Sequence, residues 1–378
     1  MTSDFDIAIC GAGPVGMALA VLLVRRGAAA QRIALIDGKS VADAETDPRS
    51  IALSHGSRQL LEQAGAWPKS TDPIRQIHVS RRGHFGRTII DCEEYGLPAL
   101  GYVARYGALV GTLAAAADDA GIVSLRPARI VSSTESSDAV ALRLEDGHTT
   151  SAQIMVQAEG GLFGDQAARS LHRDYEQTAV IAQVTSSAPI PHRAFERFTD
   201  EGPLALLPQE GGYSLVWCMR PATAARIGRL TDAAFLNELQ RAFGNRLGRF
   251  TGVGRRIAYP LGLNAHAAIS ARTAAIGNAA QTLHPVAGQG LNLGLRDAAE
   301  LARLLAREAT PAMLERYAQI RQSDRSVTIQ LTDTMARIFS SAPDGALSQT
   351  MLGLSLGLID AFNPVKRLLS EQLMFGRR

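Results

Sequence analysis

Short apolar runs and a helical repeat alternate near the start of the chain. Residues 5–10, FDIAIC, are typical of a buried strand, and residues 14–26 carry apolar side chains at helical spacing. Gly27 follows where that helix would end. Residues 32–37 form a second apolar run that closes on Asp37. This order predicts a right-handed βαβ unit with parallel strands.

The rest of the chain alternates predicted helices with strand-rich stretches. Helices are expected at residues 57–64, 107–120 and 291–307, and the remainder up to Arg378 is predicted to be mostly helical. Strands are expected within residues 74–100, 123–130, 140–144, 178–260 and 274–277. Segments typical of dinucleotide binding lie toward both ends. The strand-rich middle is therefore predicted to form a second lobe inserted between them.

Composition narrows the class of protein. Of the 378 residues 46% are hydrophobic, and 39 basic against 36 acidic residues leave a net charge of +3, which does not favour nucleic acid as a partner. Cys10, Cys92 and Cys218 lie too far apart to suggest a disulfide framework or a zinc site. Residues 1–6 contain no base and no apolar run reaches the roughly 18 residues of a spanning helix, so we expect a cytoplasmic protein.

A glycine-rich turn, GAGPVG at residues 11–16, follows the first strand. Glycines in this spacing permit a tight turn, close approach of a pyrophosphate to the backbone, and close packing of helix on strand. The helix N-terminus then offers its amides and the positive end of its dipole to the phosphates. Asp37 stands where an acid would bond a ribose hydroxyl. We expect a dinucleotide site formed by Gly11, Gly13, Pro14, Val15, Gly16 and Asp37. The alternative is an ordinary tight turn, and the motif alone does not choose between NAD and FAD.

A second glycine-rich segment, HPVAGQGLNLGLRD, occupies residues 284–297. Where a helix is predicted to begin, the backbone is left without side chains at Gly288, Gly290 and Gly294. The positive end of that helix would stabilise an anionic ring system such as a reduced flavin. A glycine-rich turn before a packing helix is the alternative reading.

This second segment resembles the most characteristic stretch of the ubiquinone-biosynthesis hydroxylases (2-polyprenyl-6-methoxyphenol hydroxylase-like), which are FAD-dependent monooxygenases with the para-hydroxybenzoate hydroxylase fold. Four further segments resemble the same family, so the resemblance covers nearly the whole chain: DPRSIALS at 47–54, GYVAR at 101–105, residues 198–208, and LMFG at 373–376.

The resemblance implies an α/β fold with an FAD-binding Rossmann-like domain of the glutathione-reductase type, an interleaved mixed β-sheet substrate domain and a helical C-terminus. We expect the FAD-binding domain at residues 1–73, 101–177 and 270–310. The substrate domain is expected at 74–100 and 178–269, and the helical C-terminal region at 311–378.

The resemblance also implies cofactor-binding residues beyond the first glycine motif. Arg49 matches a family arginine that lies against the flavin, and Arg105 stands where the family has a flavin-side polar residue. The other expected cofactor-binding residues are Asn278, Pro285, Gly288, Gln289, Gly290, Leu291 and Asn292. His284 is expected to be a structural hydrogen-bonding residue. No catalytic residue is assigned, because the cofactor supplies the chemistry, and no metal is expected.

Two departures from the family pattern concern the cofactor and its reductant. Asn278 and Gln281 replace a family aspartate and histidine, and Asn278 can still accept one hydrogen bond. Residues 159–166, EGGLFGDQ, keep an acid and a glycine of a family motif linked to FAD and the nicotinamide donor. Phe163 and Gln166 replace its serine and arginine, so the departure concerns the motif linked to the nicotinamide donor.

The implied activity is hydroxylation of a polyprenylated phenol in ubiquinone biosynthesis: NADPH or NADH reduces FAD, O2 adds to give a C4a-hydroperoxide, and one oxygen is transferred to the ring. Two alternatives stay open, a flavin enzyme of this fold acting on a soluble aromatic, and a non-catalytic or accessory subunit of a hydroxylase complex. The tail from Met351, with apolar residues beside Lys366 and Arg367, is expected to contact the inner membrane, a ubiquinone-biosynthesis complex or the protein's own core.

Overall fold

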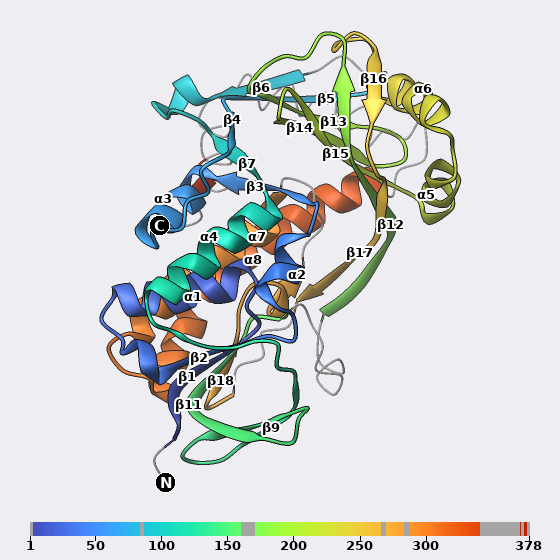
Figure 1. The fold of residues 1–378 in the computed structure, drawn as a ribbon. Coiled ribbons are helices and arrows are strands. Elements are labelled where there is room, and N and C mark those ends of the chain that lie inside the picture. Colours follow the sequence, from blue (N-terminus) through green and yellow to red (C-terminus); the bar gives the residue numbers. More distant parts are fainter. Residues whose placement is uncertain are drawn as a thin grey trace.

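The computed structural model describes residues 3–83, 87–159, 171–265, 270–282, 288–340, 371, 374 and 375. Figure 1 shows two lobes, a lower one with helices packed on a sheet and an upper one built on a larger sheet. The helices are α1 Pro14–Arg25, α2 Val41–Glu45, α3 His55–Gln63, α4 Tyr106–Asp119, α5 Pro221–Gly228, α6 Asp232–Phe243, α7 Gln289–Leu305 and α8 Pro311–Ser340, with 3-10 turns η1 Ala30–Arg32, η2 Cys92–Tyr95 and η4 Gly277–Ala279.

The lower lobe contains a sheet in the order β8-β2-β1-β11-β10-β9, with β18 paired to β11. Ile7 and Ile9 of β1 enter a core shared with α1, α4 and α7, whereas Ala8 and Cys10 enter a second core closed by β9 and β10. Since both faces of β1 are buried, apolar residues follow one another without alternation. The strands are β1 Phe5–Cys10, β2 Ile33–Ile36, β8 Val123–Leu125, β9 Ile130–Glu135, β10 Val140–Leu144, β11 Thr149–Gln157 and β18 Thr273–Ala275.

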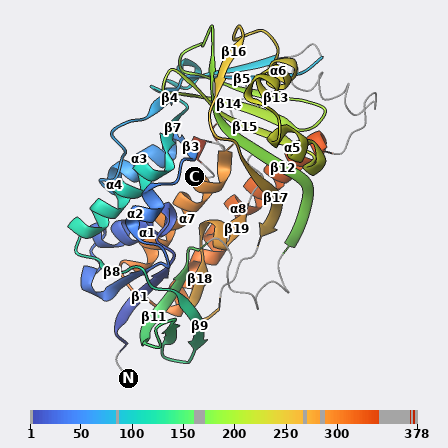
Figure 2. The ribbon, with the colours of Figure 1, turned by 45° about the vertical axis from the view of Figure 1, so that its right-hand side comes forward.

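The upper lobe contains a second sheet in the order β19-β17-β12-β15-β14-β13-β5-β6, with β16 paired to β12. Figure 2 shows α5 and α6 against its outer face, where Phe195, Trp217, Phe235 and Phe243 form an aromatic core. The strands are β5 Gln76–Arg81, β6 Arg87–Asp91, β12 Leu171–Ser186, β13 Arg193–Phe198, β14 Pro203–Gln209, β15 Gly212–Met219, β16 Phe250–Val253, β17 Ile257–Ala265 and β19 Gln281–Thr282.

A small antiparallel sheet lies between the two lobes. It has the order β3-β7-β4, with β3 Ser50–Ser54, β7 Gly101–Arg105 and β4 Asp72–Ile74. Ile74 and Val103 pack against Ala194 of the second sheet. Ser54 ends β3 and caps α3, because its hydroxyl accepts a hydrogen bond of 3.2 Å from the Ser57 amide. The small sheet therefore fixes both α3 and the second sheet relative to the first lobe.

The expected fold class is confirmed, with parallel strands β1 and β2 flanking α1 and a mixed second sheet. The strand predicted at 123–130 is divided into β8 and β9, because Pro127 has no amide to offer a sheet. Strand β12 crosses the domain limit proposed at residues 177 and 178, and it pairs with β17 from Leu171 onward. In the part of the chain that the structure describes, no helix is long and apolar enough to cross a membrane.

Candidate functional site

The turn after β1 is shaped by two glycines that leave no room for a side chain. Gly11 has a φ of +110°, and its amide donates to the Ile36 carbonyl over 2.7 Å. A Cβ on Gly11 would lie 2.6 Å from the Glu159 amide nitrogen, and one on Gly16 would lie 1.9 Å from the Gly11 carbonyl oxygen. Gly11 and Gly16 therefore serve the close approach of β11 and α1 to the turn.

Gly13 differs from these two because space is free beside it. A Cβ on Gly13 would meet only the Tyr106 hydroxyl oxygen, at 3.7 Å, among the described atoms. Gly13 is the N-cap of α1 without a side-chain cap, and Pro14 occupies the first turn. An uncapped helix N-terminus with open space above it suits a phosphate anion. The residues present thus fit the diphosphate of a dinucleotide.

Asp37 follows β2 and ties the glycine turn to it. Its carboxylate accepts hydrogen bonds from the amides of Ala12, at 2.7 Å, and Lys39, at 2.8 Å. A carboxylate can accept about four hydrogen bonds, which leaves capacity for a ribose hydroxyl. Glu159 lies two residues after the end of the neighbouring strand β11, and burial followed by the charge of Asp37 raises the pKa of its carboxyl group. Two acids thus lie at the carboxyl ends of the parallel strands.

The N-terminus of α7 forms a second uncapped helix end. Gly288 takes the left-handed conformation with φ +60°, and no side chain caps the helix. A Cβ on Gly290 would meet no atom within 4 Å among the described residues, so the first turn of α7 is open. Gln289 is buried, and Leu291 packs against the first lobe's core. This helix end can face an anionic ring.

Asn292 holds that helix end in place. Its side-chain oxygen accepts from the Ser54 amide (2.8 Å) and the Ser57 hydroxyl (2.7 Å), and its side-chain nitrogen donates to the carbonyls of Ala52 (3.1 Å) and Gly288 (2.7 Å). These four bonds use the full capacity of an amide. Asn292 therefore positions the α7 turn against β3 and α3 with its side chain.

Val15 joins the two glycine-rich segments that are far apart in sequence. A Cβ on Gly294 would lie 2.7 Å from Cγ2 of Val15, and a Cβ on Gly277 would lie 3.2 Å from the same atom. The first turn of α1, the second turn of α7 and the turn η4 therefore converge on one side chain. Asn278, the residue after Gly277, is exposed at this junction.

Arg49 and Arg105 lie at neighbouring ends of the small sheet, since Ser50 pairs with Arg105. The Arg49 guanidinium donates to the Asp47 carboxylate at 2.7–3.0 Å and lies 4.8 Å from the Tyr106 ring centroid. The hydrogen bond that the Arg49 guanidinium donates to Asp47 is the largest influence on the Arg49 pKa and raises it. Arg49 thus stays charged beside the open end of α1.

Arg105 reaches across to the second sheet. Its guanidinium makes two bonds to the Glu210 carboxylate, at 2.9 and 2.5 Å. Nearby, Ser50 donates to Gln209 over 2.5 Å and Gln183 donates to Ser50 over 2.9 Å. Sequence reasoning missed Gln183, Gln209 and Glu210. The strand period would have placed the first two on one face of their strands, but nothing local indicated which face meets Ser50.

A buried ion cluster supports α7 from behind. Asp297 is fully buried and accepts from Arg321 (2.8 Å), Arg325 (3.2 Å), Gln281 (2.9 Å) and the Gly277 amide (3.3 Å). Burial acts to raise the Asp297 pKa, but the charges of Arg325 and Arg321 outweigh it and lower the pKa. Gln281, which replaces the family histidine, therefore has a structural partner here.

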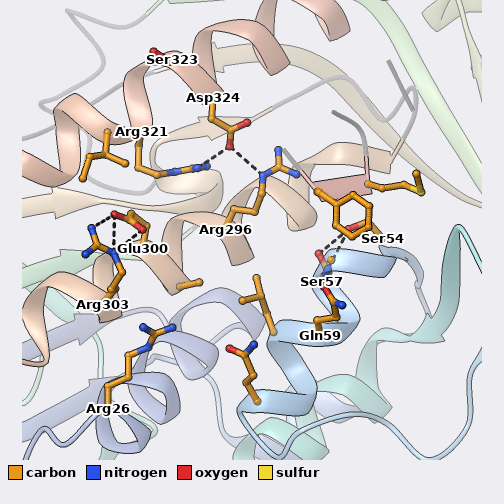
Figure 3. Close-up of a pocket in the computed structure, with 17 residues that line it drawn as sticks. Arg26, Ser54, Ser57, Gln59, Arg296, Glu300, Arg303, Arg321, Ser323 and Asp324 are labelled. Atoms are coloured by element: carbon orange, nitrogen blue, oxygen red, sulfur yellow. Dashed lines mark hydrogen bonds and ion pairs between the residues drawn. The ribbon is translucent and has the colours of Figure 1, made fainter. Parts of the chain in front are cut away.

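A pocket of about 630 Å³ lies between α3, α7 and α8, and Figure 3 shows the residues that line it. Arg296 (3.0 Å) and Arg321 (2.7 Å) share the Asp324 carboxylate on one side of it. Ser54 and Ser57 lie on the opposite side, and the Ser57 hydroxyl also bonds Asn292. The pocket therefore lies behind the α7 turn held by Asn292.

Some expected site residues lie outside the described residues. Pro285 and His284 are among them, as are Gly160, Phe163 and Gln166 of the mid-chain motif. Among the described histidines, cysteines and acids, no group of three or more could hold a metal ion.

Sequence and structure comparisons place this chain among flavoproteins. A family model described as an FAD binding domain matches residues 4–331. The chain is 32% identical to the ubiquinone hydroxylase UbiL of Rhodospirillum rubrum, over 98% of this chain and 89% of that protein. It is 30% identical to 3-demethoxyubiquinol 3-hydroxylase of Escherichia coli, over 85% and 86%. The solved structure of p-nitrophenol 4-monooxygenase PnpA from Pseudomonas putida matches the whole of both chains with a TM-score of 0.77, and at 16% identity it shows the fold alone.

These findings confirm the expected resemblance to the ubiquinone-biosynthesis hydroxylases, FAD as the cofactor and FAD-dependent monooxygenation as the class of activity. The open glycines of α1 and α7 are the features of this chain that fit the cofactor. The match extends over most of the chain, and the protein belongs to the family defined by this FAD binding domain.

Proposed function

We propose that this protein hydroxylates the aromatic ring of a polyprenylated phenol, an intermediate of ubiquinone biosynthesis, with FAD, O2 and NADPH or NADH. The observation that carries the proposal is the meeting of two uncapped helix ends, those of α1 and α7, around Val15. Each end has an open glycine, as a bound dinucleotide with a flavin ring requires. The substrate class follows from the names of the full-length relatives.

The cofactor-binding roles proposed here are assigned from the place of each residue in the structure or in its motif. Gly11, Gly13, Pro14, Val15 and Gly16 form the diphosphate turn, and Asp37 accepts from the ribose. Asn278 serves the ribityl chain, and Gly288, Gln289, Gly290, Leu291 and the backbone of Asn292 present the α7 turn to the flavin ring. Pro285 belongs to this set by its place in the motif. Arg49 brings a positive charge to the flavin side, and Arg105 holds the second sheet over it.

The protein's own contribution is positioning and the exclusion of water. When bound, the reduced flavin activates O2 for transfer of one oxygen atom to the ring, by the route that the resemblance implies. The second sheet brings a mostly apolar wall toward the flavin-binding lobe, with Ala194, Ile77 and Leu207 packed on the small sheet. An apolar wall excludes water and suits a prenylated ring.

Product analysis tests the proposal. Purified protein loaded with FAD is given NADPH, heavy-isotope O2 and ortho-prenylphenol, a phenol with one isoprene unit. We expect a product that has gained one labelled oxygen atom. If labelled oxygen enters only phenols without a prenyl group, the alternative of a soluble aromatic substrate is favoured. If FAD binds but no phenol is hydroxylated, the accessory-subunit alternative is favoured.

A further inference from the structure

Glu196 lies in the middle of β13, on the face of the second sheet that is turned to the flavin-binding lobe. Phe195 packs on the opposite face with α6, so alternation along the strand puts Glu196 on the inner face with Ala194. Ala194 contacts Ile74 and Val103 of the small sheet. The same face carries Gln183, which donates to Ser50, and Gln209, which accepts from Ser50. In Figure 2, α5 and α6 lie on one side of this sheet and the small sheet lies on the other.

The surroundings of Glu196 are almost entirely apolar. Val79 and Ala205 stand opposite it on the neighbouring strands. Cys218 is a titratable neighbour: burial and, after it, the charge of Glu196 raise the pKa of the Cys218 thiol. Arg81 lies two residues from Val79 on the same face, yet no ion pair joins it to Glu196, and the Glu196 carboxylate makes no hydrogen bond with any described residue.

The Glu196 side chain is enclosed by protein but keeps part of its surface accessible. A carboxylate sealed in a core without a partner is strongly disfavoured. A carboxylate that keeps part of its surface accessible can instead find its partner in a ligand. Burial alone raises the Glu196 pKa to about 7, so the group changes charge close to neutral pH.

We propose that Glu196 is the group that takes the proton from the hydroxyl of the phenol substrate. The inference rests on the proposed function and names a catalytic residue for it. In this step the phenol O–H bond breaks, the proton moves to the Glu196 carboxylate, and the electron pair stays on the phenol oxygen. The resulting phenolate is richer in electrons at its ortho and para carbons, which favours transfer of an electrophilic oxygen to the ring. No other oxidant or reductant enters the step.

The chemistry of the second sheet's inner face around Glu196 fits the role of a general base. A base with a pKa near the working pH is the most effective general base, and such groups contribute roughly 10²- to 10⁴-fold to rate. The side chains opposite Glu196 on both neighbouring strands are apolar. The Glu196 carboxylate has no protein partner among the described residues. A phenol whose hydroxyl reaches Glu196 would place its prenyl group along the apolar surface around it.

The test compares Glu196→Gln with Asp200→Asn, using ortho-prenylphenol as the probe. Asp200 is exposed and lies four residues after Glu196, and its substitution by Asn removes the same charge. In the unsubstituted protein and in Asp200→Asn, kcat/KM should fall as the pH drops through about 7, because the base becomes protonated. In Glu196→Gln, kcat/KM should fall about 100-fold and lose this dependence, and Glu196→Asp should recover part of the rate.

Infrared spectroscopy gives a readout independent of turnover. A protonated carboxyl band that titrates near neutral pH should be present in the unsubstituted protein and absent from Glu196→Gln. Adding ortho-prenylphenol should shift that band. Unchanged kcat/KM and pH dependence in Glu196→Gln, or a band that ignores the phenol, would overturn the assignment. Failure of the proposed function itself would appear differently, as no phenol hydroxylation by the unsubstituted protein.

Discussion

The Asp37 carboxylate accepts a hydrogen bond of 2.7 Å from the Ala12 amide, so the acid after β2 holds the glycine turn that follows β1. A second bond, of 2.8 Å from the Lys39 amide, fixes the carboxylate itself. The two halves of the dinucleotide motif are thus joined before any ligand binds. A preformed site of this kind loses little entropy when it binds its ligand.

Replacing Asp37 tests that relationship. Asp37→Asn keeps one acceptor oxygen of the two and removes the charge, so FAD should bind about 10- to 100-fold more weakly, as expected for loss of charged hydrogen bonds. Titration of FAD into the apoprotein, followed by quenching of flavin fluorescence, measures this. Asp146→Asn, at an exposed turn, is the matched control and should bind FAD normally. Equal affinity in both variants would show that Asp37 does not contact the ribose.

Gly13 and Gly16 should respond in opposite ways to alanine. Gly16→Ala would bring a Cβ to 1.9 Å from the Gly11 carbonyl, so we expect the free energy of unfolding to fall by about 1–3 kcal/mol or more. Gly13→Ala meets only the Tyr106 hydroxyl at 3.7 Å, so the apoprotein should keep its stability while FAD affinity falls. Urea unfolding of both apoproteins and FAD titration of Gly13→Ala separate the two effects. A Gly13→Ala variant with undiminished affinity would argue against phosphate binding there.

The buried ion cluster predicts a large stability loss from one substitution. Asp297→Asn leaves Arg325 without a carboxylate and Arg321 with Asp324 alone, and breaking a buried pair costs about 3–5 kcal/mol. Because the Asp297 pKa is lowered, the stability it contributes is present above the ordinary aspartate pKa and is lost as the pH falls through the folded value. Asp232→Asn, which breaks an exposed pair with Arg256, should change stability by less than about 1 kcal/mol. Similar denaturation midpoints for the two variants would refute this account.

The raised pKa of Glu196 predicts a dependence of stability on pH opposite to that of Asp297. Burial raises its pKa from 4.5 to about 7, so the folded protein holds the proton more tightly than the unfolded chain does. The resulting stability is present below pH 4.5 and is lost as the pH rises toward 7. Glu196→Gln should therefore match the unsubstituted protein near pH 4.5 and exceed it at higher pH. The gain is at most about 3 kcal/mol and is reduced by the part of the side chain that water reaches. Denaturation curves at several pH values measure the difference, and a constant difference across pH would contradict the shift.

The tail offers a test of membrane contact. Most of residues 351–378 lie outside the described residues, but Met374 packs with Cys92 and Leu100, and the rings of Phe375 and His55 meet edge to face at 6.0 Å. Deleting residues 367–378 should lower binding to vesicles that contain anionic lipid, if the basic end contacts a membrane. Charge reversal of Arg377 and Arg378 alone keeps the Met374 and Phe375 packing and is the sharper variant. Undiminished vesicle binding in this variant would rule out that role for the two arginines.

Local patterns in the sequence predicted the elements that the site is built on. The apolar run of β1, the glycine turn and Asp37 lie within one βαβ unit, where strand and helix periods are sufficient. Gly288 opens α7 as its motif indicated, with a left-handed backbone. These features depend on neighbours in sequence, which is why they could be predicted.

The remaining features depend on contacts between distant segments. The partner of Arg105 is Glu210, and Val15 meets Gly294, pairs that no local period connects. Asn292 was expected at the cofactor, but its side chain is used by four protein groups, because the α7 turn must be held to β3 and α3. Tertiary packing decides which polar side chain meets protein and which meets ligand.

The absorption spectrum of the purified protein loaded with FAD, recorded before and after anaerobic NADPH, tests the central claim most directly. The account predicts flavin bands that bleach when NADPH is added, because it proposes that FAD binds at the α1 and α7 helix ends and is reduced there. Bands that persist even with ortho-prenylphenol present would contradict hydroxylation driven by NADPH. Absence of any flavin band after incubation with FAD would contradict the site itself.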